Sequence, residues 1–127
     1  MRRVVVISRC RGNWLQRLRF RAYARLAVRD CLMRGEAPVA AHLLYGHRVI
    51  LRDWVDAERA MGMEAGQAWI AVADAVAVYA DYGVSEGMSA DVSAANAANV
   101  PVLYRYILGP APEDQSGDLF RNYGGLM

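Results

Sequence analysis

Hydrophobic and polar residues follow one another in blocks that predict alternating strands and helices. Continuous apolar runs rich in β-branched residues, at positions 4–7 and 75–80, are typical of strands covered on both faces and predict strands at 3–8 and 75–80. Shorter runs predict two more strands, at 38–42 and 101–107. The segments between the runs predict helices at 14–34, 54–73 and 88–99, with an irregular stretch at 43–51.

This element order favours a parallel sheet with helices on both faces. We predict an α/β fold, a three-layer sandwich around a four-stranded parallel Rossmann-like sheet with strand order 2-1-3-4. The 127-residue chain fits one domain, at residues 1–108. Residues 109–127 contain Pro, Gly, Asp and Ser and predict a C-terminal tail.

Helix boundaries can be placed from short polar residues. Asn13 is a good N-cap for the first helix, Asp53 can cap the second, and Ser85 or Ser89 can cap the third. Asp74 is expected to close the turn after the second helix. That helix also contains Gly62 and Gly66, which favour close packing against another backbone.

Composition narrows the class of protein. Hydrophobic residues make up 55% of the chain, but no apolar run reaches the roughly 18–20 residues that span a bilayer. The apolar run at 4–7 is too short for a signal peptide. Two cysteines, Cys10 and Cys31, form neither a disulfide scaffold nor a zinc site. We expect a cytoplasmic protein without a membrane partner, a metal or a cofactor.

Charge is divided unevenly between the two parts of the chain. Residues 1–34 hold ten Arg and one acid, whereas residues 35–127 hold five Arg and twelve acids. A basic N-terminal third suggests contact with phosphate or nucleic acid. The absence of Lys also fits a GC-rich genome. Four arginines recur at every fourth position and form one stripe that is either solvated or paired with distant acids: Arg17, Arg21, Arg25 and Arg29.

The polar residues of interest follow the predicted strands, at 8–13, 42–45 and 81–87. Ligands of open α/β sheets bind at this carboxyl edge. The first loop offers a hydroxyl, guanidinium groups and backbone N–H groups before a helix, and so describes a phosphate site: Ser8, Arg9, Arg11, Gly12 and Asn13. A merely solvated basic loop is the competing interpretation.

The segment that opens the third helix is a second candidate. Its residues are Ser85, Glu86, Gly87 and Met88, with Asp91 one turn further on. Backbone N–H groups here can hold an oxyanion, although acids at a helix N-terminus also simply favour the dipole. A lone His42 is more often structural. The arginines beside Cys10 can lower the pKa of its thiol, but no neighbouring motif supports nucleophilic catalysis by this Cys. Trp14, Trp54 and Trp69 are expected in a core or an interface.

Several of these segments, in this order, resemble the nucleoside 2-deoxyribosyltransferase-like superfamily, and in particular a little-characterised phage and bacterial branch. The similarity covers about residues 3–107. The segments that carry it are Ser8-Arg9-Cys10-Arg11-Gly12, Ala41-His42-Leu43-Leu44-Tyr45, Arg59 with Gly62 and Gly66, Ala73-Asp74, Ser85-Glu86-Gly87-Met88 and Val100-Pro101-Val102.

The resemblance implies cleavage of the N-glycosidic bond of nucleosides or their 5′-monophosphates by a Glu nucleophile. That Glu lies four residues after a Gly and six after a phosphate- or sugar-binding Ser, and the same frame falls on Asp91 here. Asp is competent as a glycosidic nucleophile but is one methylene shorter. The usual Tyr of the first loop is also replaced, by Cys10.

Three functions are therefore weighed. The first is an N-glycosidase or deoxyribosyltransferase on nucleoside 5′-monophosphates, with Asp91 as nucleophile and His42 or Glu86 handling the base or a proton. The second is a non-catalytic protein that senses or sequesters a nucleotide on the same fold. The third and least favoured is nucleic-acid binding through the arginine stripe. A homo-oligomer, dimer or larger, is expected because apolar candidates need cover: Trp54, Met61, Met63 and Trp69.

Overall fold

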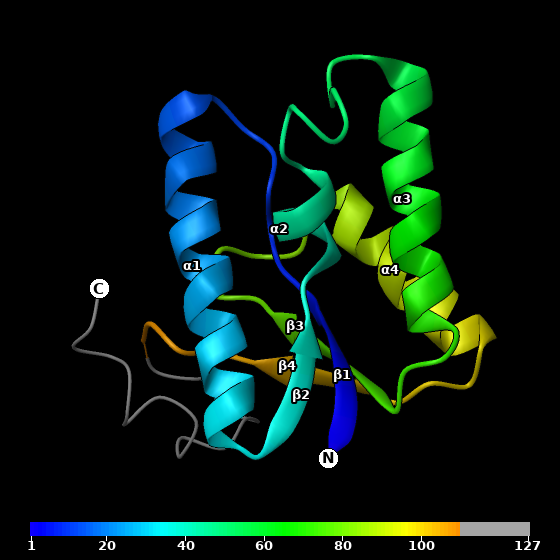
Figure 1. Ribbon diagram of the computed structural model, residues 1–127. Coiled ribbons are helices and arrows are strands. Elements are labelled where there is room, and N and C mark those ends of the chain that lie inside the picture. Colours follow the sequence, from blue (N-terminus) through cyan, green and yellow to red (C-terminus); the bar gives the residue numbers. More distant parts are fainter. Residues whose placement is uncertain (110–127) are drawn as a thin grey trace.

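Four parallel strands form a single sheet in the computed structural model, which describes residues 1–109 (Figure 1). The elements in chain order are β1 (Arg2–Ile7), α1 (Trp14–Met33), β2 (Glu36–Val39), α2 (Ala41–Tyr45), α3 (Asp56–Ile70), β3 (Ala75–Tyr79), α4 (Glu86–Ala97) and β4 (Val102–Arg105). Apart from Gly109, the predicted C-terminal tail lies outside the described residues.

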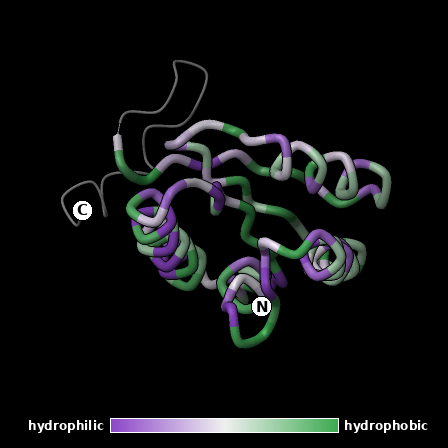
Figure 2. The backbone as a smooth tube through the Cα atoms, turned by 90° about the horizontal axis from the view of Figure 1, so that it is seen from above, coloured by the Kyte–Doolittle hydropathy of each residue, from purple (hydrophilic) through white to green (hydrophobic). Residues whose placement is uncertain are grey.

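The sheet has the order β2-β1-β3-β4, so the predicted α/β sandwich and its strand order 2-1-3-4 are confirmed. Val4 of β1 pairs with Pro38 of β2 on one side and with Ala75 of β3 on the other. Seen from above, α1 lies on one side of the sheet, and α3 and α4 lie on the other (Figure 2). This arrangement brings the carboxyl ends of the central strands β1 and β3 to one edge.

Two apolar layers hold the helices to the sheet. On the α1 face, Val4 and Val6 of β1 pack with Tyr23 and Ala27. On the opposite face, Val5 and Ile7 pack with Ile70 at the end of α3 and with helix α4. The alternation along β1 explains its continuous apolar run, because successive side chains enter opposite layers.

The second strand begins and ends earlier in the chain than its sequence suggests, at Glu36–Val39. Residues 38–42 were expected to be a strand ending at His42, but β2 ends at Val39 and His42 lies in the helix α2. This helix packs on the two predicted glycines of α3. A Cβ added at Gly62 would lie 3.1 Å from Leu51 Cδ1, and one at Gly66 would lie 3.5 Å from Ala41 Cβ. The segments that pack closely against Gly62 and Gly66, as the sequence predicted, are therefore α2 and the residues that follow it.

The predicted caps have mixed outcomes. Asn13 and Ser85 cap α1 and α4 as expected. The prediction for Asp53 is wrong, because α3 begins after Val55. The prediction for Asp74 is also wrong: its carboxylate accepts the backbone N–H of Arg3 at 2.7 Å and the Arg3 guanidinium at 3.3 Å, and so joins the start of β1 to the start of β3.

Within residues 1–109, no helix combines the length and apolar character needed to cross a membrane.

Candidate functional site

A cavity of about 750 Å³ opens beside the carboxyl end of β1, between α1, α2, α3 and the N-terminus of α4. Its volume lies within the range of small-molecule sites. Its floor is formed by β1 and by the first loop, defined here as residues 8–12. Its walls come from the N-terminal half of α1, from His42 and Tyr45 of α2, and from the inner face of α3.

Most of the residues predicted for a site line this one cavity. They are Ser8, Arg9, Arg11, Gly12, His42, Ser85, Glu86, Gly87, Met88 and Asp91. Asn13 is not among the lining residues, because its side chain turns back onto its own helix. It accepts the backbone N–H of Gln16 at 2.9 Å, while the Gln16 side chain accepts the backbone N–H of Asn13 at 2.9 Å.

The first loop lines the cavity and has backbone donors without an acceptor among residues 1–109. The backbone N–H groups of Cys10, Arg11 and Gly12 donate no hydrogen bond to any residue in the described part of the chain. Arg9 is anchored elsewhere, through a guanidinium bond of 3.2 Å to the carbonyl of Tyr82. Free N–H groups ahead of the α1 N-terminus form the kind of concavity that binds anions.

The N-terminus of α4 borders the same space. Ser85 Oγ accepts the backbone N–H of Met88 at 3.3 Å, and the buried Met88 side chain fixes this turn against the sheet. Asp91 lies one turn further along α4 and lines the cavity. Burial raises the pKa of the Asp91 carboxyl, and a hydrogen bond from Gln67 acts in the opposite direction. A carboxyl with a raised pKa in a cleft is a candidate for acid–base or nucleophilic chemistry.

His42 and Ser8 meet at the base of the cavity. Ser8 Oγ and His42 Nε2 are 2.9 Å apart, and Ser8 is only 4% exposed. Burial lowers the pKa of His42 to about 4, so its imidazole is neutral at pH 7. The second strand therefore does not deliver His42 to the edge as expected; the short helix α2 does.

The charges in the cavity are only partly paired. Five arginines and four acids line it: Arg9, Arg11, Arg17, Arg21, Arg59, Asp53, Glu58, Glu86 and Asp91. Arg17 lies 3.6 Å from Asp53, and Glu58 pairs with Arg52 outside the cavity. Arg11, Arg21 and Arg59 have no ion-pair partner among residues 1–109, nor do Glu86 and Asp91. The cavity thus has arginines without an ion-pair partner on the first loop, α1 and α3, and carboxyls without an ion-pair partner on α4.

The arginine stripe of α1 is divided by the fold. Arg17 and Arg21 line the cavity, whereas Arg25 and Arg29 are exposed on the remainder of the helix. Their four-residue spacing was visible in the sequence, but which end faces a cavity depends on tertiary structure. Sequence reasoning from the residues also assigned no site role to Arg59, Tyr45 or Met63, all of which line the cavity.

Cys10 and the tryptophans have different surroundings from those that the sequence suggests. Cys10 is reached by solvent, but the cavity walls around it desolvate the thiol and raise its pKa, against the smaller lowering effect of Arg11. A reactive thiolate is therefore not favoured. None of the tryptophans lies in a core, because Trp14, Trp54 and Trp69 are exposed and Trp54 is at the cavity wall; their place in an interface stays a prediction.

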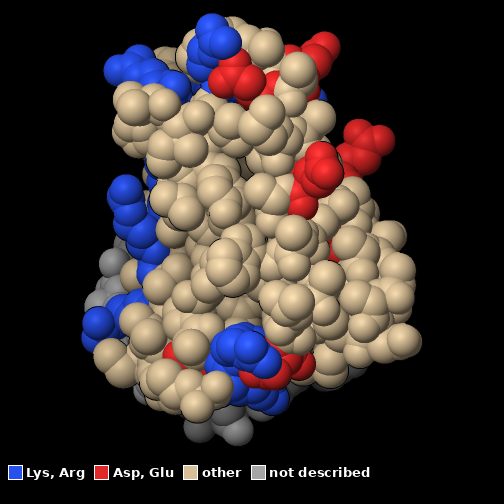
Figure 3. Space-filling model, turned by 45° about the vertical axis from the view of Figure 1, so that its right-hand side comes forward, with Lys and Arg blue, Asp and Glu red and all other residues tan. Residues whose placement is uncertain are grey.

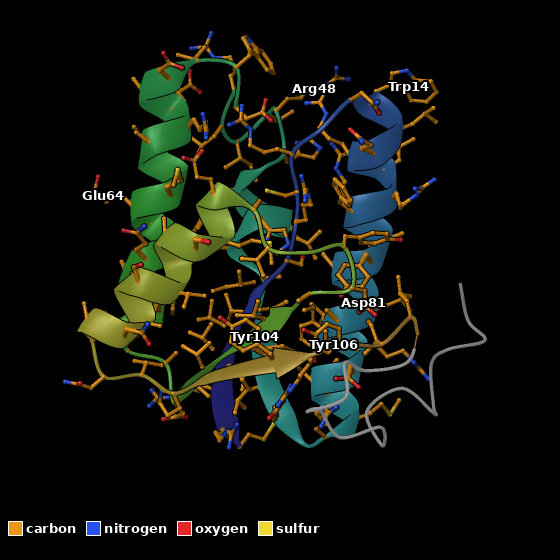
Figure 4. All side chains as sticks on the ribbon, turned by 180° about the vertical axis from the view of Figure 1, so that it is seen from behind. Trp14, Arg48, Glu64, Asp81, Tyr104 and Tyr106 are labelled. Atoms are coloured by element: carbon orange, nitrogen blue, oxygen red, sulfur yellow. The ribbon has the colours of Figure 1, made fainter. Side chains whose placement is uncertain are left out.

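Asp81, at the end of β3, belongs to the opposite face. Its carboxylate accepts Tyr23 Oη at 2.5 Å and the backbone N–H groups of Ile107 and Leu108 at 2.8 and 3.0 Å. Figure 4 shows Asp81 beside α1. Its bonds attach the end of the described chain to that helix, and Asp81 takes no part in the cavity.

Among residues 1–109, no three His, Cys, Asp or Glu side chains are grouped closely enough to hold a metal ion.

Residues 2–105 match the model of a family described as a domain of unknown function, DUF7768. The matched span includes all four strands and every residue that lines the cavity. No curated protein has a significant sequence match to the chain.

Proposed function

The chain belongs to the DUF7768 family of unknown function, and we propose that its cavity binds a nucleoside 5′-monophosphate whose N-glycosidic bond is cleaved with Asp91 as the nucleophile. The observation that carries this proposal is the polarity of the cavity. Arginines without an ion-pair partner and backbone N–H groups come from the first loop, α1 and α3, and two carboxyls without an ion-pair partner, Glu86 and Asp91, come from α4. A nucleotide has the matching polarity, with an anionic phosphate at one end and a hydroxyl-bearing sugar next to it.

In this proposal the phosphate of the nucleotide binds at the first loop. The free N–H groups of residues 10–12 and the guanidinium of Arg11 are donors, and charge-assisted hydrogen bonds to phosphate are about twice as strong as neutral ones. Ser8, Arg9 and Gly12 complete the loop. Ser85, Gly87 and Met88, at the second helix N-terminus on the cavity, contact the phosphate or the sugar.

The sugar then lies toward α4, with C1′ facing Asp91. In the first step the Asp91 carboxylate attacks C1′, and the electron pair of the C1′–N bond passes to the base. The departing base takes a proton from Glu86, which lines the same cavity. In the second step water replaces the ester oxygen at C1′ and returns its proton to Glu86, which releases the sugar phosphate. A second base in place of water makes the reaction a transfer.

His42 is not the proton donor in this scheme. With a pKa of about 4, its imidazole carries no excess proton near neutral pH. The raised pKa of Asp91 has a kinetic consequence, because only the ionised carboxylate attacks. Base release should therefore increase as the pH rises through the pKa of Asp91.

A nucleotide-sensing or sequestering protein without turnover is the second candidate. Two departures from the resembling enzymes favour it: Asp91 stands where they have the longer Glu, and Cys10 replaces their first-loop Tyr. A misplacement of about 1 Å can lower a rate on the order of 10²-fold. The binding half of the proposal is the same for both candidates.

The proposal includes a homo-oligomer acting in the cytoplasm and encoded by a phage or bacterial genome. Charged side chains on the α3 side of the molecule gather around a broad uncharged surface (Figure 3). On α3 and just before it, Trp54, Met61 and Trp69 are 66%, 57% and 48% exposed, which is unusual for a surface without a partner. Met63 and Trp54 both line the cavity, so Met61 and Trp69 are the two members of this group that lie outside it.

The test measures free base released from the four common 2′-deoxynucleoside 5′-monophosphates and their ribose counterparts. Wild type should release base from at least one of them. Asp91→Asn should abolish release while changing nucleotide affinity by less than about 1 kcal/mol, because only a transition-state interaction is lost. Binding without release by wild type would support the sequestering protein instead, and the absence of both would reject the proposal.

A further inference from the structure

The bond between Ser8 and His42 has two possible directions. Ser8 Oγ can donate to an unprotonated Nε2, or a protonated Nε2 can donate to Ser8 Oγ. The distance of 2.9 Å is the same for both, but the group that remains for a ligand differs. In the first case the Ser8 hydrogen is used by His42. In the second, Ser8 Oγ accepts from His42 and its own hydrogen is free to point into the cavity.

His42 makes this bond as a neutral imidazole near pH 7. It lines the cavity and is partly buried, and desolvation is the cause of its lowered pKa of about 4. A neutral imidazole has one N–H, so the tautomer alone decides the direction. No side chain or backbone group in the described part of the chain contacts the Nδ1 atom through a hydrogen bond, which leaves Nδ1 without a partner that would impose a tautomer.

The neighbouring groups favour one direction when an anion is present. Ser8 continues into the first loop, whose free backbone N–H groups at Cys10, Arg11 and Gly12 are all donors. The Arg11 guanidinium adds further donors. An anionic oxygen at this floor gains another hydrogen bond only if the Ser8 hydroxyl also donates, and that requires His42 to supply the proton of the Ser8–His42 bond.

We propose that His42 is a positioning residue whose Nε2–H donates to Ser8 Oγ and thereby turns the Ser8 hydroxyl into a donor for an anionic oxygen of the ligand. This inference rests on the proposed function for the identity of the ligand, a phosphate monoester, but not for the direction of the bond. In this inference His42 orients the Ser8 hydroxyl, whereas from the sequence we expected it to contact the base or to transfer a proton. It also makes Ser8 a phosphate donor that depends on a residue 34 positions away in the chain.

The tautomer is read directly by NMR of protein labelled with ¹⁵N-histidine. The chain has two histidines, His42 and His47. His47 lies outside the cavity lining, and its Nδ1 accepts the backbone N–H of Val49 at 3.2 Å. His47→Gln therefore leaves a single imidazole to observe. We expect a protonated Nε2 and an unprotonated Nδ1 at pH 7, both without ligand and with 2′-deoxyadenosine 5′-monophosphate. A protonated Nδ1 in the complex overturns the inference.

Affinity variants test the consequence for the ligand. Ser8→Ala should weaken binding of 2′-deoxyadenosine 5′-monophosphate about tenfold, which is the size expected for a hydrogen bond to a charged group. His42→Leu should cost less than Ser8→Ala, because the Ser8 hydroxyl keeps its hydrogen but loses the donor that orients it. In a Ser8→Ala background His42→Leu should cost nothing further. His42→Gln retains an N–H donor and should recover most of the affinity. Thermal unfolding of each variant establishes that it is folded.

Matched ligands separate this inference from the proposed function. Binding of 2′-deoxyadenosine, which lacks the phosphate, should be the same in wild type and Ser8→Ala. If wild type binds the monophosphate and Ser8→Ala binds it equally well, the inference fails and the proposed function stands. If wild type binds no nucleotide, the proposed function fails, and titration of inorganic phosphate into wild type and Ser8→Ala decides the inference: equal affinities, or no binding by either protein, overturn it.

Discussion

Two groups of charged side chains lie on this sheet, and only one of them is fully paired. Under α1, the buried Arg105 guanidinium crosses from β4 to Glu36 of β2 and makes two bonds of 2.8 Å. It also donates to Tyr79 Oη at 3.1 Å, and Tyr79 donates to Asp30 at 2.6 Å. In the cavity, by contrast, Arg11, Arg21 and Arg59 have no ion-pair partner among residues 1–109.

The difference separates charges that hold the fold from charges that are free to meet a ligand. Burying an ion without a partner costs several kcal/mol, so the group under α1 must be complete. No buried side-chain nitrogen or oxygen in the described part of the chain lacks a hydrogen-bond partner. The cavity arginines avoid this cost because they reach solvent, and they retain their hydrogen-bond donors. Arginine therefore has two roles in this protein. Where it is paired and buried it stabilises the fold, and where it has no ion-pair partner in the cavity it is available to a ligand.

The largest expected effect comes from breaking the paired group. Glu36→Leu leaves the Arg105 guanidinium buried without its carboxylate and should lower the free energy of unfolding by about 3–5 kcal/mol. Urea denaturation measures it. The double variant Glu36→Leu/Arg105→Met removes both charges and should recover most of the loss. A cost below about 1 kcal/mol for the single variant would show that Arg105 does not depend on this partner.

An effect of intermediate size comes from His42. Its pKa is about 4 in the folded protein and 6.5 as a reference for the unfolded chain, so the unfolded state binds more protons between these values. The contribution is fully present above pH 6.5 and is lost as the pH falls toward 4. We expect wild type to lose about 1–3 kcal/mol more than His42→Gln over this interval. Parallel stability curves for the two proteins would contradict a His42 that desolvation keeps neutral in the folded protein.

A smaller effect separates two helix caps. Asn13→Ala should lower the free energy of unfolding by about 0.5–2 kcal/mol through loss of the α1 cap, with nucleotide affinity unchanged because Asn13 does not line the cavity. Ser85→Ala should lower stability similarly, through the α4 cap, and also weaken binding. Equal losses of affinity in both variants would mean that Asn13 contacts the ligand after all.

The smallest effect on stability is expected from the unpaired arginines. Arg11→Gln and Arg21→Gln should change the free energy of unfolding by no more than about 0.5 kcal/mol. Both should weaken nucleotide binding, whereas Arg25→Gln, on the exposed part of the same stripe, should not. A loss of 1 kcal/mol or more in unfolding for Arg11 or Arg21 would give these residues a structural role and remove the contrast with Arg105.

The sequence determines much of the fold because its signals are local. The β-branched runs at 4–7 and 75–79 occupy the two central strands, and alternating elements with right-handed crossovers leave few possible strand orders. Helix α2 was missed because five residues carry too little periodicity to predict a helix. What holds it in place is its contact with Gly62 and Gly66 of α3, a tertiary interaction.

The sequence predicted where the candidate site lies in the fold, but not the electrostatics of its side chains. Loops after neighbouring parallel strands must meet at one edge, which is why Ser8 and Ser85 come to border one cavity. Electrostatics could not be predicted in the same way. The arginines beside Cys10 suggested a lowered pKa for its thiol, but desolvation by walls from distant segments reverses the sign. Likewise, only the folded chain shows that Asp53 pairs with Arg17 and that Arg11 pairs with none of residues 1–109.

The most direct test of the central claim is a crystal structure of Asp91→Asn with a 2′-deoxynucleoside 5′-monophosphate. The account predicts the phosphate at the backbone N–H groups of residues 10–12 and at Arg11, with the side chain of residue 91 about 3–3.5 Å from C1′. A nucleotide bound with its phosphate away from the first loop, or with C1′ turned away from residue 91, would contradict it.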